Sequence, residues 1–187
     1  MKNDHDPRLA QIRNWLEGLP ADLNLAVDTL RPASADASFR RYFRLDAGQR
    51  TLIVMDAPPQ HEDCRPFLHV GQLLADAGLN VPAVLAQDLG LGLLLLSVLG
   101  EHTYYQRIQA GLDDSQLQTL YREALAALVK LQQASTAGLA SYDTARLADE
   151  LKLFPEWYVQ KHHGAALDDK TANALEKIFA LLSASNG

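Results

Sequence analysis

Residues 38–59, SFRRYFRLDAGQRTLIVMDAPP, decide the fold. The first half carries aromatic and apolar side chains that favour a strand, and the run 51–55 is rich in β-branched residues. Residues 46–49 separate the two halves, and Gly48 can take the positive φ of a tight turn. A run this short is also compatible with a buried helix segment, but the flanking Gly48 and Pro58 favour a strand. The stretch therefore predicts a β-hairpin, and we expect it to hold the ligand if the chain is an enzyme.

Side chains on a strand alternate between its two faces. The second strand therefore places Ile53 and Met55 on one face and Leu52, Val54 and Asp56 on the other. Asp56, just before the Pro-Pro pair, is compatible with holding a cation or with capping a turn, and the turn is favoured.

The segments around the hairpin predict a sheet with one inserted helix. Asp6 and Pro7 are typical of a helix start, and Gly18 and Pro20 of its end. We expect strands over 23–30, 38–45, 51–55, 83–87 and 93–96, a loop over 31–37, and a helix from His61 or Asp63 to Ala77. The result is a five-stranded antiparallel sheet with its only helix between the third and fourth strands.

The pattern changes to helices after Gly100. We expect helices over 104–110, from Asp113 or Asp114 to Leu131, over 144–162 with an interruption near Pro155, and over 168–183. Strands followed by helices indicate an α+β fold. We expect an N-terminal helix over 1–19, a small lobe over 20–98 and a helical part of a large lobe over 99–187.

Composition and charge exclude several classes of protein. The 187 residues are 48% hydrophobic and 21% charged, as in ordinary globular proteins. The net charge of −6 argues against nucleic-acid binding. A single cysteine, Cys64, rules out an intrachain disulfide and leaves open a reactive thiol. The N-terminus lacks a signal-peptide core and no apolar run is long enough for a membrane span, so we expect a cytoplasmic protein that binds no membrane.

Five stretches together resemble the aminoglycoside phosphotransferase-like kinases. They are DASFRRYFRL (36–45), IVMDAPP (53–59), EDCRPF (62–67), LLADAGLNVPAVLAQDLGLGLLLLS (73–97) and DELKLFPEWY (149–158). The chain is more similar still to the bacterial N-acetylmuramate and N-acetylglucosamine anomeric kinases of cell-wall sugar recycling. The resemblance implies a protein-kinase-like fold, with ATP under the first hairpin and adenine bound by the hinge after the fifth strand.

Carried over by position, the resemblance implies a set of nucleotide-binding residues. Loop 35–41 would cover the phosphates through backbone N–H groups, aided by Arg40 or Arg41. The hinge would follow the fifth strand, and the second hairpin strand would line the pocket. The nucleotide-binding residues implied in this way are Ser38, Phe39, Arg40, Arg41, Ile53, Met55, Leu96, Ser97, Val98 and Leu99.

Two features depart from the kinase pattern. Met55 stands where such folds carry a lysine, and Phe67 stands near the position of its glutamate partner. Losing both partners leaves no unpaired charge. None of the six histidines begins a His-x-Asp-x4-Asn catalytic loop. We therefore expect an N-terminal portion of a kinase that has no catalytic residue and no magnesium ligand of its own, because the Mg²⁺ ligands lie outside this chain.

Glu156 and Trp157 are candidates for the sugar site, because an aromatic face and a carboxylate suit a sugar. A Trp157 packed in a helical core beside a solvated Glu156 is the favoured alternative. The pair His162-His163 is compatible with a metal ligand, but a solvated pair is favoured because adjacent helix residues point different ways.

Three functions stay open at this stage. They are an amino-sugar kinase, an aminoglycoside-modifying phosphotransferase, and a non-enzymatic nucleotide-binding or interaction module. In each case we expect a small-molecule partner, a nucleotide with or without an amino sugar. We also expect self-association through exposed apolar positions of the last helix: Leu175, Ile178, Phe179 and Leu182.

Overall fold

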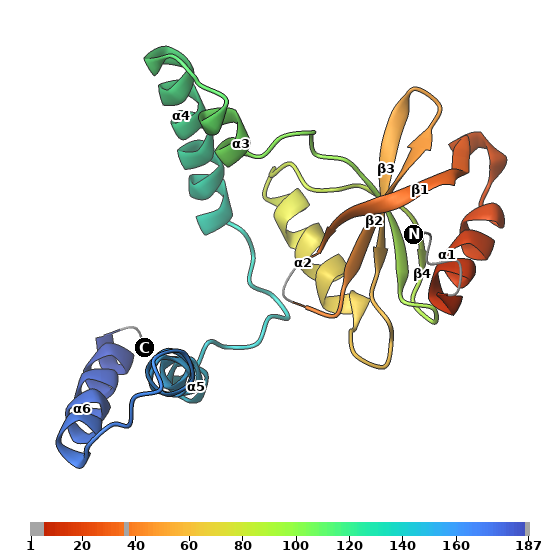
Figure 1. Ribbon diagram of the computed structural model, residues 1–187. Coiled ribbons are helices and arrows are strands. Elements are labelled where there is room, and N and C mark those ends of the chain that lie inside the picture. The colour runs from red at the N-terminus through yellow and green to blue at the C-terminus, as the bar shows by residue number, and fades with distance from the viewer. Residues whose placement is uncertain (1–5, 36–37, 186–187) are drawn as a thin grey trace. The chain divides into compact units, whose positions relative to one another are not determined.

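The computed structural model describes residues 6–35 and 38–185. Its centre is a five-stranded sheet in the order β1-β2-β3-β5-β4, in which all neighbouring strands are antiparallel. The strands are β1 (Leu25–Ala35), β2 (Arg41–Ala47), β3 (Arg50–Asp56), β4 (Val84–Asp88) and β5 (Leu93–Ser97) (Figure 1). Every residue from 50 to 97 is described, and α2 (Cys64–Asp76) is the only helix there. The predicted sheet and its inserted helix are confirmed.

The β2–β3 hairpin turns through Gly48 and Gln49, between the paired residues Ala47 and Arg50. Gly48 has a φ of +62°, the conformation predicted for it. Its N–H donates to the carbonyl oxygen of Asn24 at 3.1 Å. Strand β2 ends at Ala47, two residues past its predicted end at Leu45, because Asp46 and Ala47 pair with β3 before the chain turns.

The prediction for the first strand was wrong at its end. β1 continues to Ala35 through the segment 31–35 that was predicted as loop because it contains a proline. A proline is tolerated here because β1 is an edge strand, so one side of it has no ladder to break. The register shifts between Ala26 and Arg31 and again between Pro32 and Ser34, and these irregularities accommodate the segment.

Helix α1 (Pro7–Glu17) packs on one face of the sheet. The Asp6 side chain accepts a hydrogen bond from the Arg8 N–H at the helix start, as the sequence predicted, and Gly18 follows the end. Ile12 and Leu16 are buried against residues of β2, β3 and β5, among them Leu45 and Val54. The first of two apolar cores therefore lies between α1 and the sheet.

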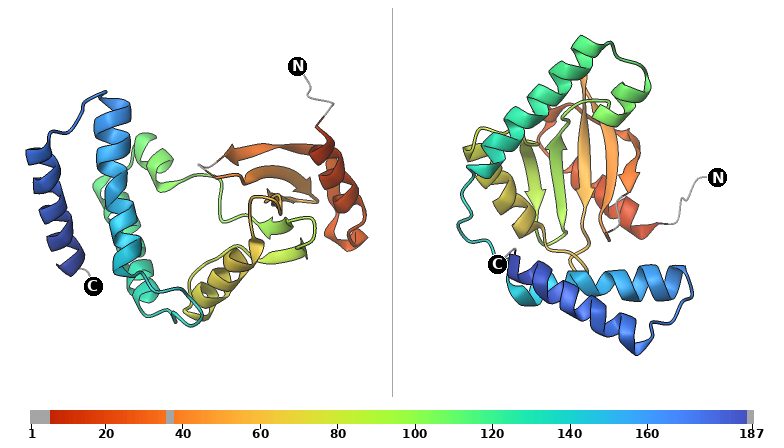
Figure 2. Two further views of the ribbon diagram at one scale, coloured as in Figure 1. Left: turned by 90° about the horizontal axis from the view of Figure 1, so that it is seen from below. Right: turned by 90° about the vertical axis from the view of Figure 1, so that its left-hand side faces the viewer.

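Helix α2 lies on the opposite face (Figures 1 and 2), where Met55, Leu94 and Leu96 pack with Cys64. Ile53 packs at the edge of this second core, whereas Leu52 and Val54 belong to the first. The predicted alternation along β3 is confirmed.

The remaining elements are helical. They are the 3-10 helix η1 (Ala21–Leu23), which precedes β1, then α3 (Tyr104–Gln109), α4 (Asp114–Gln132), α5 (Thr144–Leu153), the π-helix η2 (Phe154–His162) and α6 (Asp169–Ser185). The interruption predicted near Pro155 is confirmed, since the α-helical geometry ends at Leu153. The chain forms two compact units, one reaching to Thr136 and the other beginning at Ala137. The predicted boundary between a small lobe and a large lobe, near residue 98, is a different division of the chain and stays a prediction.

Gly92 is the position at which the fold requires glycine. Its φ is +67°, and a Cβ there would overlap the carbonyl oxygen of Ala57. The Ala57 N–H donates to the Gly92 carbonyl at 2.9 Å, so the two backbone segments are bonded to each other. We expect Gly92→Ala to lower the free energy of unfolding by about 2 kcal/mol or more, because left-handed strain and a backbone clash add. Urea denaturation of the variant and of the unsubstituted protein measures this difference in the free energy of unfolding.

Gly71 provides the matched control. It lies inside α2 with no atom within 4 Å of the position its Cβ would take. Gly71→Ala should stabilise the protein by up to about 1 kcal/mol, because alanine is the better helix former. Equal effects of the two substitutions would contradict the assignment for Gly92.

Candidate functional site

A buried carboxylate lies where β3 leaves the sheet. Asp56 is 0% exposed and is the one buried polar or charged side chain among the described residues. One of its oxygens accepts from Arg8 Nε at 2.8 Å and from Arg8 Nη2 at 2.6 Å. The other accepts from Arg41 Nε at 2.9 Å and Nη2 at 2.7 Å. Each guanidinium thus occupies one oxygen, and the charge of Asp56 is fully paired.

Two further bonds extend this cluster. Arg41 Nη1 donates to an Asp6 oxygen at 2.7 Å, and Arg8 Nη2 donates to the Leu91 carbonyl at 2.5 Å. Burial alone would lower the pKa of Arg41, but its bonds to Asp6 and Asp56 raise it. The Arg41 bond also holds the pKa of Asp6 below its ordinary value. The cluster of Asp6, Arg8, Arg41 and Asp56 therefore joins α1, the start of β2, the end of β3 and the β4–β5 turn.

The turn-capping interpretation of Asp56 is wrong, because its carboxylate binds two arginine cations. Arg8 was missed by sequence reasoning altogether. It lies 48 residues from Asp56, and no local motif links two such positions. Asp6 was predicted only as a helix cap, a role it fills while also binding Arg41.

The loop before β2 is held to the segment before α2. Within residues 38–40, the backbone N–H and Nε of Arg40 both lie 3.1 Å from Ser38 Oγ. The Phe39 ring stacks on His61 with centroids 4.7 Å apart, and the Phe39 N–H donates to Glu62 at 3.3 Å. Phe39 remains 64% exposed. Residues 36 and 37 of the predicted phosphate loop lie outside the described residues.

The two arginines proposed as phosphate ligands lie on different sides of the sheet. Arg41 belongs to the ion cluster on the α1 side, with both of its carboxylate partners. Arg40 instead lines an open groove of about 1130 Å³ along α2. The groove is also lined by Glu62, Asp63, Phe67, Val84 and Gln87. Of the two, Arg40 is the cation on the same side as Ile53 and Met55.

The predicted apolar and hinge residues follow the sheet. Met55 is 0% exposed and Leu96 is buried beside it, while Ile53 is half-buried. Ser97 ends β5, and its N–H donates to the Ala83 carbonyl oxygen at 2.9 Å. Val98 and Leu99 follow in irregular backbone, the position expected of a hinge. Their contact with a nucleotide stays a prediction.

Cys64 is a core residue in this arrangement. It begins α2, is 4% exposed and packs with Met55. Burial raises the pKa of its thiol, and the nearby Asp63 carboxylate adds to that effect. The thiolate, which is the nucleophilic form, is therefore disfavoured.

In the second unit, Glu156 and Trp157 lie on the π-helix η2. Trp157 is 56% exposed within the described residues, and both expectations for it, a sugar contact and a packed core residue, stay predictions. Lys161 Nζ lies 3.5 Å from the centroid of the Trp157 ring. Tyr158 stacks between Phe154 and His162, at centroid distances of 5.6 and 5.8 Å. This helix thus carries an exposed aromatic surface.

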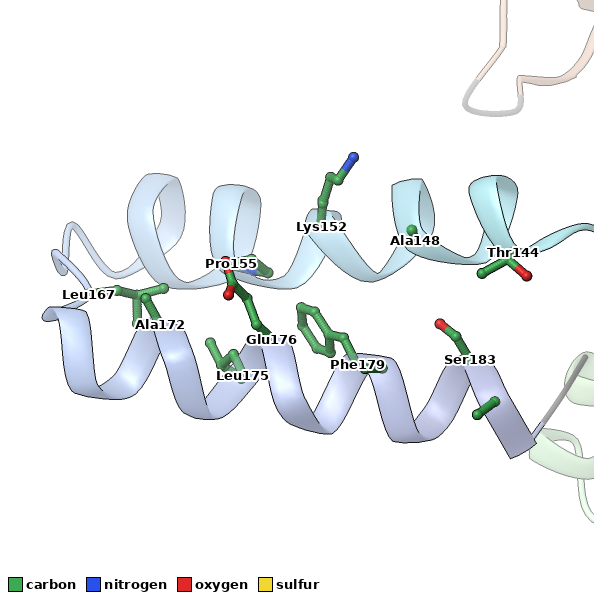
Figure 3. A pocket seen from close by; sticks show the side chains of 12 residues that line it. Thr144, Ala148, Lys152, Pro155, Leu167, Ala172, Leu175, Glu176, Phe179 and Ser183 are labelled. Atoms are coloured by element: carbon green, nitrogen blue, oxygen red, sulfur yellow. The ribbon is translucent and has the colours of Figure 1, made fainter.

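A hollow of about 750 Å³ also lies in this unit, between α6 and the helix formed by α5 and η2 (Figure 3). Leu175 and Phe179 of α6 line it, opposite Ala148 and Pro155. Ile178 and Leu182, in contrast, are 50% and 45% exposed. Two of the four apolar positions expected to be exposed on this helix therefore face its neighbour. Self-association stays a prediction.

Comparison with known proteins identifies the family. Residues 29–186 match the phosphotransferase enzyme family. The chain belongs to this family. It is similar to three curated proteins named N-acetylmuramate/N-acetylglucosamine kinase. They come from Pseudomonas aeruginosa (46% identity over 95% of this chain and 54% of that protein), Pseudomonas putida (41%, 96% and 54%) and Neisseria meningitidis serogroup B (38%, 87% and 48%).

The chain spans about half the length of these curated relatives. The resemblance noted from the sequence is confirmed, and so is the protein-kinase-like α+β architecture expected of a phosphotransferase of this family. Within residues 6–35 and 38–185, no three His, Cys, Asp or Glu side chains form a group able to hold a metal ion. Within the same residues, no helix is both long and apolar enough to cross a membrane.

The Asp56 cluster can be tested by stability. Asp56→Ala leaves the Arg8 and Arg41 guanidiniums without their shared partner, and we expect a loss of about 3 kcal/mol in the free energy of unfolding. The control is Asp46→Ala, which removes the partner of Arg31 from a pair whose side chains are both 46% exposed. That loss should stay below about 1 kcal/mol. Urea denaturation of both variants measures the difference, and similar losses would contradict the role of Asp56.

Proposed function

We propose that this chain is the N-terminal, ATP-binding portion of a kinase that phosphorylates the anomeric hydroxyl of N-acetylmuramate and N-acetylglucosamine. The observation that carries the proposal is the 46% identity, over 95% of the chain, to a protein named as that kinase. The fold supports it, because phosphotransferases with a kinase-like small lobe place ATP beneath such a sheet. The proposed partners are therefore a nucleotide and an amino sugar, both small molecules, in the cytoplasm.

The α2 side of the sheet supplies the proposed nucleotide contacts. Ile53 gives the accessible apolar contact for adenine, with Met55 and Leu96 buried behind it, and the backbone of 97–99 gives the hinge. Ser38, Phe39 and Arg40 cover the phosphates, with Arg40 as the cation in the place of the usual lysine. Arg41 acts indirectly in this scheme, since its two carboxylate partners hold the start of β2 in place.

Magnesium neutralises phosphate charge when it binds in phosphotransferases. The described residues offer no group of acidic side chains that fits it, so we place its ligands outside this chain. We place the base and the catalytic loop there too, because none of the six histidines begins the expected motif. Residues 1–187 alone would then bind ATP weakly and transfer no phosphate.

The test of the function is ADP release in a coupled assay, with N-acetylmuramate, N-acetylglucosamine or an aminoglycoside as acceptor. It is run on this chain and on a protein extended to the length of its curated relatives. We expect turnover on the two amino sugars by the longer protein only, because positioning and charge neutralisation both need its second half. Turnover on the aminoglycoside alone, or on no acceptor, overturns the proposed function. Turnover by the 187-residue chain would place a catalytic site within it.

Arg40 gives a prediction at the level of one residue. In the longer protein, Arg40→Ala should raise the KM for ATP or lower kcat by about 10- to 100-fold in total, because a charge-assisted hydrogen bond to phosphate is lost. Arg50→Ala, at the exposed end of the hairpin, is the matched control and should leave both constants unchanged. Unchanged constants in Arg40→Ala would exclude the role.

A further inference from the structure

The exposed surface of η2 carries an aromatic side chain and a lysine in contact, a pair that the proposed nucleotide site does not include. Trp157 and Lys161 are four residues apart on this helix, and the Lys161 ammonium lies 3.5 Å from the indole centroid. Trp157 is 56% exposed. The hollow shown in Figure 3 is lined by neither residue, so the pair belongs to a different surface of the same helix.

Lys161 differs from the lysine nearest to it on this helical segment. Lys152 donates to the Asp149 carboxylate at 2.8 Å, and this bond raises the pKa of Lys152. Within the described part of the chain, Lys161 makes no ion pair, and its ammonium contacts the indole ring of Trp157. A cation held only by an exposed ring is weakly bound, so its ammonium can turn to an anionic ligand at small cost.

These two side chains match a ligand that is part sugar and part carboxylate. The apolar C–H face of a pyranose packs on an indole, and a carboxylate accepts charge-assisted bonds from an ammonium. N-acetylmuramate carries a carboxylate on its lactyl ether, whereas N-acetylglucosamine has none. The curated relatives are named for both sugars.

We propose that Trp157 and Lys161 form the acceptor-sugar subsite, in which Trp157 holds the ring of either sugar and Lys161 binds the lactyl carboxylate of N-acetylmuramate alone. This inference rests on the proposed function. Lys161 is then a specificity residue, since its contact exists for one of the two substrates only.

The binding test uses tryptophan fluorescence in the 187-residue chain. The chain has two tryptophans, so Trp15→Phe leaves Trp157 as the only reporter. We expect both sugars to change its emission. Lys161→Gln should raise the Kd for N-acetylmuramate about 10-fold, the loss of one charge-assisted contact, and leave that for N-acetylglucosamine unchanged. Lys161→Arg should restore the binding of N-acetylmuramate. Added salt should weaken the binding of N-acetylmuramate and leave that of N-acetylglucosamine unchanged.

Lys152→Gln is the matched control, because it removes a lysine of the same segment that is already paired. It should change neither affinity. The same split should appear in the longer protein as a raised KM for N-acetylmuramate with the KM for N-acetylglucosamine and both kcat values unchanged. No emission change with N-acetylmuramate, or equal effects of Lys161→Gln on the two sugars, overturns the subsite. If the unsubstituted longer protein phosphorylates neither sugar, the proposed function fails instead.

Discussion

The buried carboxylate of Asp56 is the constraint on which the small lobe depends. Burying one charge in an apolar interior is expensive unless cations accompany it. Here Arg8 arrives from α1 and Arg41 from β2, and each binds one oxygen. Both must be present for the pairing to be complete, so α1 is fixed against the sheet by more than its apolar contacts. Two of these four bonds, both from Arg41, also hold the start of β2 to the end of β3.

This cluster also separates the roles of two adjacent arginines. Side chains alternate along an extended chain, so once Arg41 is bound on the α1 side, its neighbour Arg40 is directed to the α2 side. Arg40 lines the groove there, on the side of Ile53 and Met55. A run of arginines that looks like one basic patch in sequence is thus divided into a structural residue and a candidate ligand. The division follows from strand geometry together with one buried acid.

Local patterns predicted most of the fold, and long-range pairing accounts for what they missed. The β3 alternation, the Gly48 turn and the start of α1 depend on neighbouring residues alone, so the sequence was sufficient. The end of β1 was missed because an edge strand tolerates Pro32, and edge position is a property of the assembled sheet. The Arg8–Asp56 pair joins positions 48 residues apart, beyond any motif. Exposure of Trp157 likewise depends on what packs around it, which composition does not reveal.

The two proposed binding surfaces differ in how far a buried core supports them. Every buried side chain in the described part of the chain lies at or before Leu96, so the sheet and its two helices hold the whole core. In α3 to α6 and η2 no residue is buried, and helices with little tertiary packing open more readily than a packed core. A nucleotide would therefore meet a preformed surface, whereas a sugar on η2 would also have to order the helix that holds it. Because ordering opposes binding, acceptor affinity should be the more sensitive of the two to whatever packs against these helices. The second half of the curated relatives would strengthen sugar binding even without touching the sugar.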